Sequence, residues 1–244
     1  SVDHFSLDHR GPVGDRRWMV TEPGGGFLTQ REHPRMATVR PRVTDAGITL
    51  SAPGMPSLQV PTTRSVAPLE VRVWKSGCVA ADQGDAAAGW FSELLDRECR
   101  FVWMPDEVSR PISGGGQEAI TFADGYPILV CHEASLEELN RHLETPVTMN
   151  RFRANVVVRG GAAWDEDRWA RLTGDEVELE MAKPCERCKV ITVDQETGVG
   201  GKEPLRTLAS FERDVEGVCF GQNAIHRATR SLRVGQTLKA HPKG

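Results

Sequence analysis

The chain has 244 residues, of which 39% are hydrophobic and 26% are charged, a composition typical of an ordinary folded protein with one large or two small domains. Its formal net charge of −4 excludes strong bulk attraction to nucleic acid polymers or to anionic membranes. No stretch approaches the roughly 18–20 consecutive apolar residues that a membrane-spanning helix needs, so we expect no membrane segment.

The first hundred residues predict a series of short strands separated by turns, which is typical of a β-barrel or sandwich. Turns are indicated at residues 24–26 and 45–47, because their glycines tolerate positive φ. Asp85 is expected to cap a helix over residues 86–96, whose apolar side chains recur at helical spacing. The predicted strands are 16–22, 27–32, 37–43, 48–52, 58–61, 69–74 and 100–104.

Residues 107–118 contain Pro111 and three consecutive glycines, and they predict a linker. A phosphate-binding glycine loop needs a following Lys-Ser/Thr pair and a helix, which the sequence lacks here. The residues beyond this linker also predict a mainly β region with short helices. The predicted strands are 128–131, 155–158, 177–181, 189–193 and 231–239, and the predicted helices are 135–143, 165–172 and one that begins at Pro204.

Cys185 and Cys188 lie in a short polar segment between two of these predicted strands. A close thiol pair suits a metal site or a dithiol redox pair, or it has no chemical role. Extended residues alternate faces, so two sulfurs three positions apart cannot bind one ion together unless the segment turns sharply. Arg187 and Lys189 flank Cys188, and nearby cations are the usual setting of metal-binding or nucleophilic thiols.

The six cysteines are dispersed over the whole chain, and the first residues lack the profile of a secretory signal. Both features indicate reduced thiols in a cytoplasmic protein. No second Cys or His pair completes a four-ligand zinc site, and a dithiol oxidoreductase is disfavoured because no thioredoxin-like βαβ setting surrounds the pair. The cysteines are Cys78, Cys99, Cys131, Cys185, Cys188 and Cys219.

Residues 151–155 alternate polar and apolar side chains. If this segment is extended, Arg151, Arg153 and Asn155 share one face. Two guanidiniums beside an amide suit recognition of a phosphate and of a heterocycle edge. A solvated strand face explains the same pattern equally well.

Six short motifs occur in the order found in a known family. They are Gly14-Asp15-Arg16-Arg17-Trp18-Met19, Phe27-Leu28-Thr29-Gln30-Arg31-Glu32, Phe152-Arg153-Ala154-Asn155, Trp164-Asp165-Glu166-Asp167-Arg168-Trp169, Pro184-Cys185-Glu186-Arg187-Cys188 and Phe220-Gly221-Gln222-Asn223. The chain resembles the MOSC family, the molybdenum cofactor sulfurase C-terminal domain. Within it, the chain is similar to the subgroup of YcbX-type proteins and the mitochondrial amidoxime-reducing component.

The resemblance runs from about residue 15 to residue 234 and implies a mainly β (α+β) fold. Residues 1–106 would form an N-terminal β-barrel-like domain, residues 107–118 a linker, and residues 119–244 a MOSC β-barrel with short peripheral helices. Family members also bind the cofactor phosphate through a Lys-Ser pair on a leading strand, which precedes the point where this sequence starts.

The resemblance implies a molybdenum–molybdopterin cofactor between the two domains. Its metal would be bound by one thiolate, that of Cys188, which is the predicted metal ligand and catalytic residue, with Cys185 as a packed neighbour. The further residues predicted to contact the cofactor are Arg16, Arg31, Asp124, Gly125, Tyr126, Arg151, Arg153, Asn155, Arg187 and Asn223.

The activity that the resemblance implies is reduction of N-hydroxylated compounds, such as hydroxylamines, amidoximes and hydroxylaminopurines, to amines. Electrons would come from a separate ferredoxin- or flavoprotein-type reductase. An alternative is a protein that carries the molybdenum cofactor or its sulfur and has no organic substrate of its own. A carrier would leave the reduced metal unchanged when an amidoxime is added.

Overall fold

The computed structural model describes residues 2–44, 46–61, 67–113, 119–227 and 231–244. In chain order the first elements are β1 (His4–Asp8), β2 (Gly11–Pro12), β3 (Trp18–Thr21), the 3-10 helix η1 (Pro34–Thr38), β4 (Arg40–Thr44), β5 (Gly47–Ser51), β6 (Leu58–Pro61), β7 (Pro68–Val73), β8 (Ser76–Asp82), α1 (Asp85–Leu95), β9 (Arg100–Trp103), β10 (Arg110–Pro111) and β11 (Ala119–Ile120). They continue with β12 (Ile128–His132), α2 (Glu133–Arg141), η2 (Met149–Phe152), β13 (Val156–Val158), η3 (Asp165–Arg168), β14 (Trp169–Thr173), β15 (Glu178–Glu186), η4 (Lys189–Thr192), α3 (Leu205–Leu208), β16 (Cys219–His226), β17 (Ser231–Arg233) and β18 (Lys239–Pro242).

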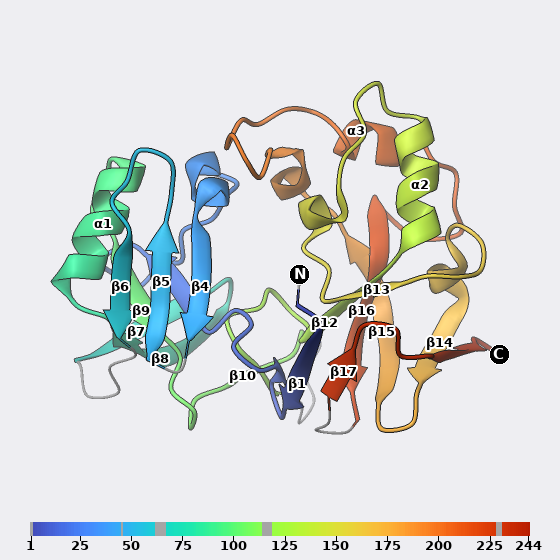
Figure 1. Ribbon diagram of the computed structural model, residues 1–244, viewed down its shortest axis with the longest axis horizontal. Helices are drawn as coiled ribbons and strands as arrows, with labels where there is room; N and C mark the ends of the chain where they lie inside the picture. The colour runs from blue at the N-terminus through green and yellow to red at the C-terminus, as the bar shows by residue number, and fades with distance from the viewer. Residues whose placement is uncertain (1, 45, 62–66, 114–118, 228–230) are drawn as a thin grey trace.

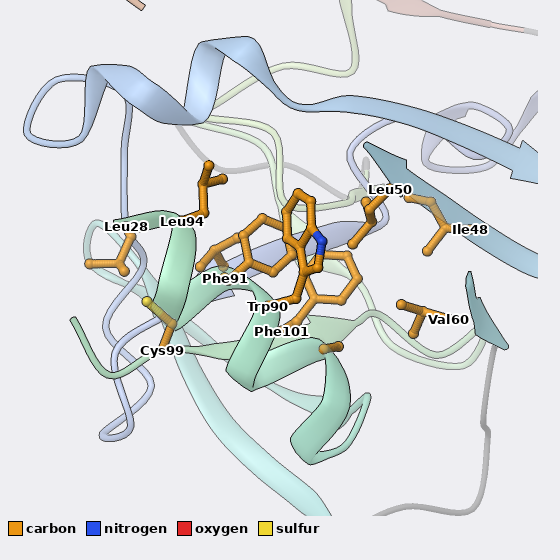
Figure 2. Packing of buried hydrophobic residues seen from close by; sticks show 11 residues of the cluster. Leu28, Ile48, Leu50, Val60, Trp90, Phe91, Leu94, Cys99 and Phe101 are labelled. Carbon is orange, nitrogen blue, oxygen red and sulfur yellow. The ribbon is translucent and has the colours of Figure 1, made fainter. Parts of the chain in front are cut away.

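The N-terminal lobe consists of two small antiparallel sheets and helix α1, at the left of Figure 1. One sheet has the strand order β3-β9-β8-β7 and the other has the order β4-β5-β6. The apolar face of α1 packs between them, because Trp90, Phe91 and Leu94 recur at helical spacing and all three are buried. Figure 2 shows these side chains against Leu50 and Phe101 from the two sheets.

The C-terminal lobe is built on a sheet with the order β13-β12-β16-β15-β14-β18, at the right of Figure 1. Strands β12 and β16 of this sheet are buried along nearly their whole length, and β12 accordingly reads as a continuous apolar run rather than as an alternating strand. Helices α2 and α3 lie at its periphery, and Leu139 and Leu208 contribute to the same buried cluster.

The two lobes are joined by the first strand as well as by the linker. Strand β1 pairs with β17, with His4 opposite Arg233 and Ser6 opposite Ser231. Leu7 is accordingly buried in the core of the C-terminal lobe. The first residues therefore pack with the C-terminal lobe, whereas the sequence division assigns residues 1–106 to the N-terminal domain.

The expectation of a mainly β protein, with an N-terminal β-barrel domain, a second β-rich domain and short peripheral helices, is confirmed. Residues 114–118 of the predicted linker, and Asp45 of the predicted turn, lie outside the described residues. Among the residues that are described, no helix is long and apolar enough to cross a membrane.

Several predicted elements are wrong in detail. The predicted strand 189–193 is mostly the 3-10 helix η4, and in the predicted strand 27–32 Phe27 makes only an isolated bridge while residues 30–32 form a turn. The predicted helix 165–172 ends at Arg168, after which β14 begins. Trp169 and Leu172 have helical spacing, but a register shift in the strand lets both be buried. Strands β8 and β16 were not predicted.

Candidate functional site

The two cysteines of the pair have different surroundings. Cys185 lies near the end of β15 and packs against a buried cluster that includes Phe152 and Phe220. The chain then leaves the strand, and Cys188 occupies the position just before η4 in an extended conformation. Both thiols are free and no disulfide joins them. Cys188 lies beyond the end of β15, so the alternation of strand residues does not relate the two sulfurs, and binding of a metal by Cys188 alone stays a prediction.

Cys188 faces the N-terminal lobe, where Arg31 contacts it. The Nε atom of Arg31 donates to Cys188 Sγ at 3.3 Å, a contact between residues 157 positions apart in the chain. The backbone N–H of Arg31 donates to Thr29 Oγ1, which fixes the turn that carries the arginine. A guanidinium beside a thiol favours binding of anionic groups at this point.

Two further residues surround the same guanidinium. The Trp74 ring centroid lies 4.6 Å from Cζ of Arg31, within the range of a cation–π contact. Asp124 Oδ2 lies 3.7 Å from an Arg31 nitrogen, and Asp124 Oδ1 accepts a 3.0 Å hydrogen bond from Trp74 Nε1. Arg31 is thus oriented by an indole, a carboxylate and a sulfur together.

A second group of contacts crosses between the lobes close by. Arg16 donates to the carbonyl oxygen of Arg153 at 3.3 Å and forms an ion pair with Asp15. Asn155 donates to the same Asp15 carboxylate at 3.0 Å and accepts from the backbone N–H of Leu129 at 3.0 Å. These bonds place a guanidinium and an amide from the predicted set at one boundary.

Arg153 connects the two groups electrostatically. Its side chain is exposed, yet the protein around it desolvates the guanidinium and lowers its pKa, and the charge of Arg16 lowers that pKa further. Asp15 and Asp124 act in the opposite direction. A guanidinium without a full counter-charge suits an anionic ligand.

We call these eight residues the interdomain cluster: Asp15, Arg16, Arg31, Trp74, Asp124, Arg153, Asn155 and Cys188. Three of them have a positive φ although they are not glycine, namely Arg16 (49°), Trp74 (55°) and Arg153 (58°). Such backbone conformations cost about 1 kcal/mol or more each and gather at binding and catalytic sites. The described chain has only two others, Asp96 and Trp164.

Three predicted residues make contacts that explain their presence without a ligand. Arg151 forms a 2.9 Å ion pair with Asp194. Arg187 donates to the carbonyl oxygens of Phe220 and Phe152, and Asn223 donates to the carbonyl of Pro184 at 3.4 Å. Cofactor contacts from these three stay predictions.

The expected shared face of Arg151, Arg153 and Asn155 is wrong. Residues 149–152 form η2, and Arg153 follows in a left-handed conformation, so the alternation of an extended strand begins only at Val156. Arg151 consequently lies apart from the other two, with its guanidinium at Asp194 and the carbonyl of Ile191.

Gly125 and Tyr126 shape the loop that carries Asp124. A Cβ atom added to Gly125 would lie 2.4 Å from Ser113 Oγ, so a side chain there would displace the loop. Tyr126 packs against the small apolar cluster of Ile112 and Ile120. Asp124 is the member of this predicted trio whose side chain joins the interdomain cluster.

Trp74 and Arg110 were not singled out from the sequence. Arg110 is buried, and its guanidinium donates to the carbonyls of Ala123 (2.9 Å) and Val73 (3.4 Å), the residues that precede Asp124 and Trp74. A tryptophan followed by lysine between two short strands was the available signal for Trp74. An internal arginine that binds backbone carbonyls leaves no pattern in the sequence.

The donor atoms of the cluster fit a metal that arrives within an organic anion. No group of three or more His, Cys, Asp or Glu side chains that could hold a metal ion occurs in the described part of the chain. One thiol contacted by a guanidinium, with two further guanidiniums and an amide elsewhere in the cluster, is instead suited to a single metal–sulfur bond plus recognition of phosphate and heterocycle groups.

Family models match both lobes of the chain. The MOSC N-terminal beta barrel domain matches residues 1–98 and the MOSC domain matches residues 117–239. Among curated relatives, mitochondrial amidoxime-reducing component 1 of Mus musculus is 35% identical over 93% of this chain and 72% of its own length.

Two further relatives agree. Mitochondrial amidoxime reducing component 2 of Bos taurus is 35% identical over 82% of this chain and 63% of its own length. Mitochondrial amidoxime-reducing component 1 of Homo sapiens is 32% identical over 93% of this chain and 73% of its own length. The two domain matches and these identities establish that the chain belongs to the MOSC family and carries the MOSC N-terminal beta barrel domain.

Proposed function

We propose that this protein binds a molybdenum–molybdopterin cofactor in the interdomain cluster and reduces N-hydroxylated compounds with electrons from a separate donor protein. The observation that carries the proposal is the contact between Arg31 and Cys188 across the two lobes. It sets one accessible thiol among cations, at the boundary of two domains. The names of the amidoxime-reducing relatives support the reaction class.

In this proposal each residue of the cluster has a separate task. Cys188 Sγ is the protein ligand of the metal, and its soft thiolate tunes the electron density of the metal. Arg16 and Arg153 bind the anionic groups of the cofactor, and Arg31 keeps a positive charge beside the sulfur. When bound, such a cofactor supplies two-electron oxygen-transfer chemistry. The protein supplies orientation and an open position for the substrate.

The proposal predicts unequal effects of the two cysteines. Cys188→Ala should lose molybdenum retention and reductase activity, because it removes the sole proposed metal ligand. Cys185→Ala should keep most of both, because Cys185 packs against the apolar cluster. Molybdenum per protein and turnover of an amidoxime are measured after expression in a host that makes molybdopterin. Equal loss in the two variants would contradict a single ligand.

The same preparation tests whether the protein turns over a substrate. When an amidoxime is added to the reduced, metal-loaded protein, the protein should become oxidised and the amidoxime reduced. A protein that only carries the cofactor or its sulfur would stay reduced. A ferredoxin- or flavoprotein-type donor and a cytoplasmic location are part of the proposal, and both stay predictions.

A further inference from the structure

Trp74 is an exposed aromatic residue in a turn where its backbone favours glycine. It is the first of two residues that connect β7 to β8, and Val73 pairs with Ser76 across the turn. Its φ of 55° costs little for glycine but is unfavourable for a bulky side chain. The position therefore carries an indole despite a backbone cost, as is common for residues at binding sites.

The indole is oriented by its neighbours and not free to rotate. Phe27 packs edge-on against it at 5.0 Å between ring centroids, and Arg31 lies over the ring. Its Nε1–H donates to Asp124. Trp74 nevertheless keeps 50% of its surface accessible. A rigid aromatic surface that stays open to solvent is preorganised for stacking with a flat ligand.

The buried Arg110 holds the turn that carries Trp74 in place. One buried guanidinium donates to the carbonyl of Val73, to Ser76 Oγ and to the carbonyls of Thr121 and Ala123. The turn of Trp74 and the loop of Asp124 are thereby joined into one unit. Binding surfaces that depend on such supporting hydrogen bonds lose little entropy when a ligand arrives.

The same unit lies one guanidinium away from the proposed metal ligand. Arg31 contacts the Trp74 ring with its Cζ end and Cys188 Sγ with Nε. Arg31 covers part of the ring, so a flat group would stack on the accessible remainder of the indole, next to the guanidinium that also contacts the thiol and near the Asp124 carboxylate. The carboxylate is 68% exposed on its side chain and can accept from the N–H groups of an amidine.

We propose that Trp74 is a specificity-determining residue that binds the ring of aromatic N-hydroxylated substrates and of their amidine products. The inference rests on the proposed function for its choice of ligand class. Small aliphatic substrates would bind beside the same thiol without using the indole. The site would accordingly prefer aromatic amidoximes to aliphatic ones of the same head group.

The test is equilibrium binding of two amidines to the metal-loaded protein, measured by calorimetry. Benzamidine carries a ring and acetamidine does not. Trp74→Gly, whose backbone suits the turn, should weaken benzamidine binding about three- to tenfold more than it weakens acetamidine binding. Trp74→Phe should retain most of the benzamidine affinity. Lys75→Ala, in the same turn, is the matched control and should bind both like the wild type.

Two results would overturn the role of Trp74: wild-type affinity of Trp74→Gly for benzamidine, or equal loss of both amidines. Turnover of hydroxylamine, which has no ring, reports on the proposed function separately. If no variant and no wild-type preparation reduces it, the proposed reaction fails, while ring-dependent binding would still support the Trp74 surface.

Discussion

The carboxyl groups of Glu166 and Asp167, adjacent in η3 of the C-terminal lobe, differ in how their charge is compensated. Glu166 is fully buried, and its Oε2 accepts from Ser135 at 2.7 Å while Oε1 has no hydrogen-bond partner among the described residues. Asp167 forms a 3.0 Å ion pair with Arg213 and accepts from Gln222. Burial raises the pKa of both carboxyls, and only that of Asp167 is opposed by an ion pair.

A raised native pKa gives Glu166 a stability contribution that depends on pH. The contribution is fully present below the ordinary glutamate pKa of about 4.3 and is lost as pH rises through the raised value in the folded protein. Glu166→Gln removes the ionisable carboxyl, so the variant does not lose this stability as the pH rises. We expect it to raise the free energy of unfolding at pH 7.5 by on the order of 1 kcal/mol and to have a smaller effect at pH 5. Urea unfolding at the two pH values measures the difference.

Asp167→Asn is the matched comparison. It leaves the nearly buried Arg213 without its counter-charge and should lower the stability by about 3 kcal/mol. A stability change of Glu166→Gln that is the same at both pH values would show that the carboxyl does not titrate in the folded protein.

The sequence predicts those site residues that belong to a recognisable pattern of neighbouring residues. Cys188 stands out because cations flank it, and Arg153 and Asn155 because they occur in a family motif. Trp74 and Arg110 belong to no such pattern, since their roles depend on a turn conformation and on backbone carbonyls brought together from separate segments. Such contacts exist only in the folded chain.

Strand β16 depends on a glycine in its interior. Gly221 has a φ of 76°, and a Cβ atom there would lie 2.6 Å from both Cys131 Sγ and the carbonyl oxygen of Val130. The neighbouring strand β15 shifts register between Pro184 and Glu186, just before the Cys188 segment. The close approach of β16 to β12 thus supports the strand pair from which the thiol emerges.

Gly221→Ala should therefore destabilise the protein by about 3 kcal/mol, since backbone strain and overpacking add. Gly235 also has a positive φ, of 83°, but no atom would contact its added Cβ within 4 Å. Gly235→Ala isolates the strain and should cost about 1 kcal/mol. Chemical denaturation followed by circular dichroism compares the two, and equal losses would remove the steric explanation.

Periodicity predicts the long and regular elements and fails at the short turns. Helix α1 and strand β12 match their predicted ranges closely because an apolar stripe or a bounded apolar run marks them. The 3-10 helices η2 and η4 span four residues each, too few to show a period. Strand β16 contains Gly, Gln and Asn in its middle, which interrupts the expected apolar pattern.

At the scale of the whole molecule, two arginines of the N-terminal lobe reach the C-terminal lobe with different partners. Arg31 contacts Cys188 within the interdomain cluster. Arg40 donates to the carbonyl oxygen of Gln195 at 2.9 Å, outside that cluster. Variants of Arg31 and Arg40 therefore distinguish a contact that would also bind a cofactor from a contact that only joins the lobes.

Cofactor loading should raise the melting temperature of the wild type by about 5 °C or more, because a ligand at 100 times its Kd adds about 2.7 kcal/mol. Arg40→Ala should lower the melting temperature of the empty and loaded forms alike and keep the same increment. Arg31→Ala should show a clearly smaller increment, since it loses a cation beside the ligand. Scanning calorimetry gives the three increments, and identical values would exclude Arg31 from the binding site.

The contact between residues 31 and 188 also fixes the order of events in biosynthesis. At about 5–20 residues per second, the ribosome adds Cys188 roughly eight to thirty seconds after Arg31. During that interval the N-terminal half can fold, but half of the prospective metal pocket does not yet exist. A cofactor would then be inserted only after Cys188 has been added, so an incomplete chain on the ribosome would not accept it.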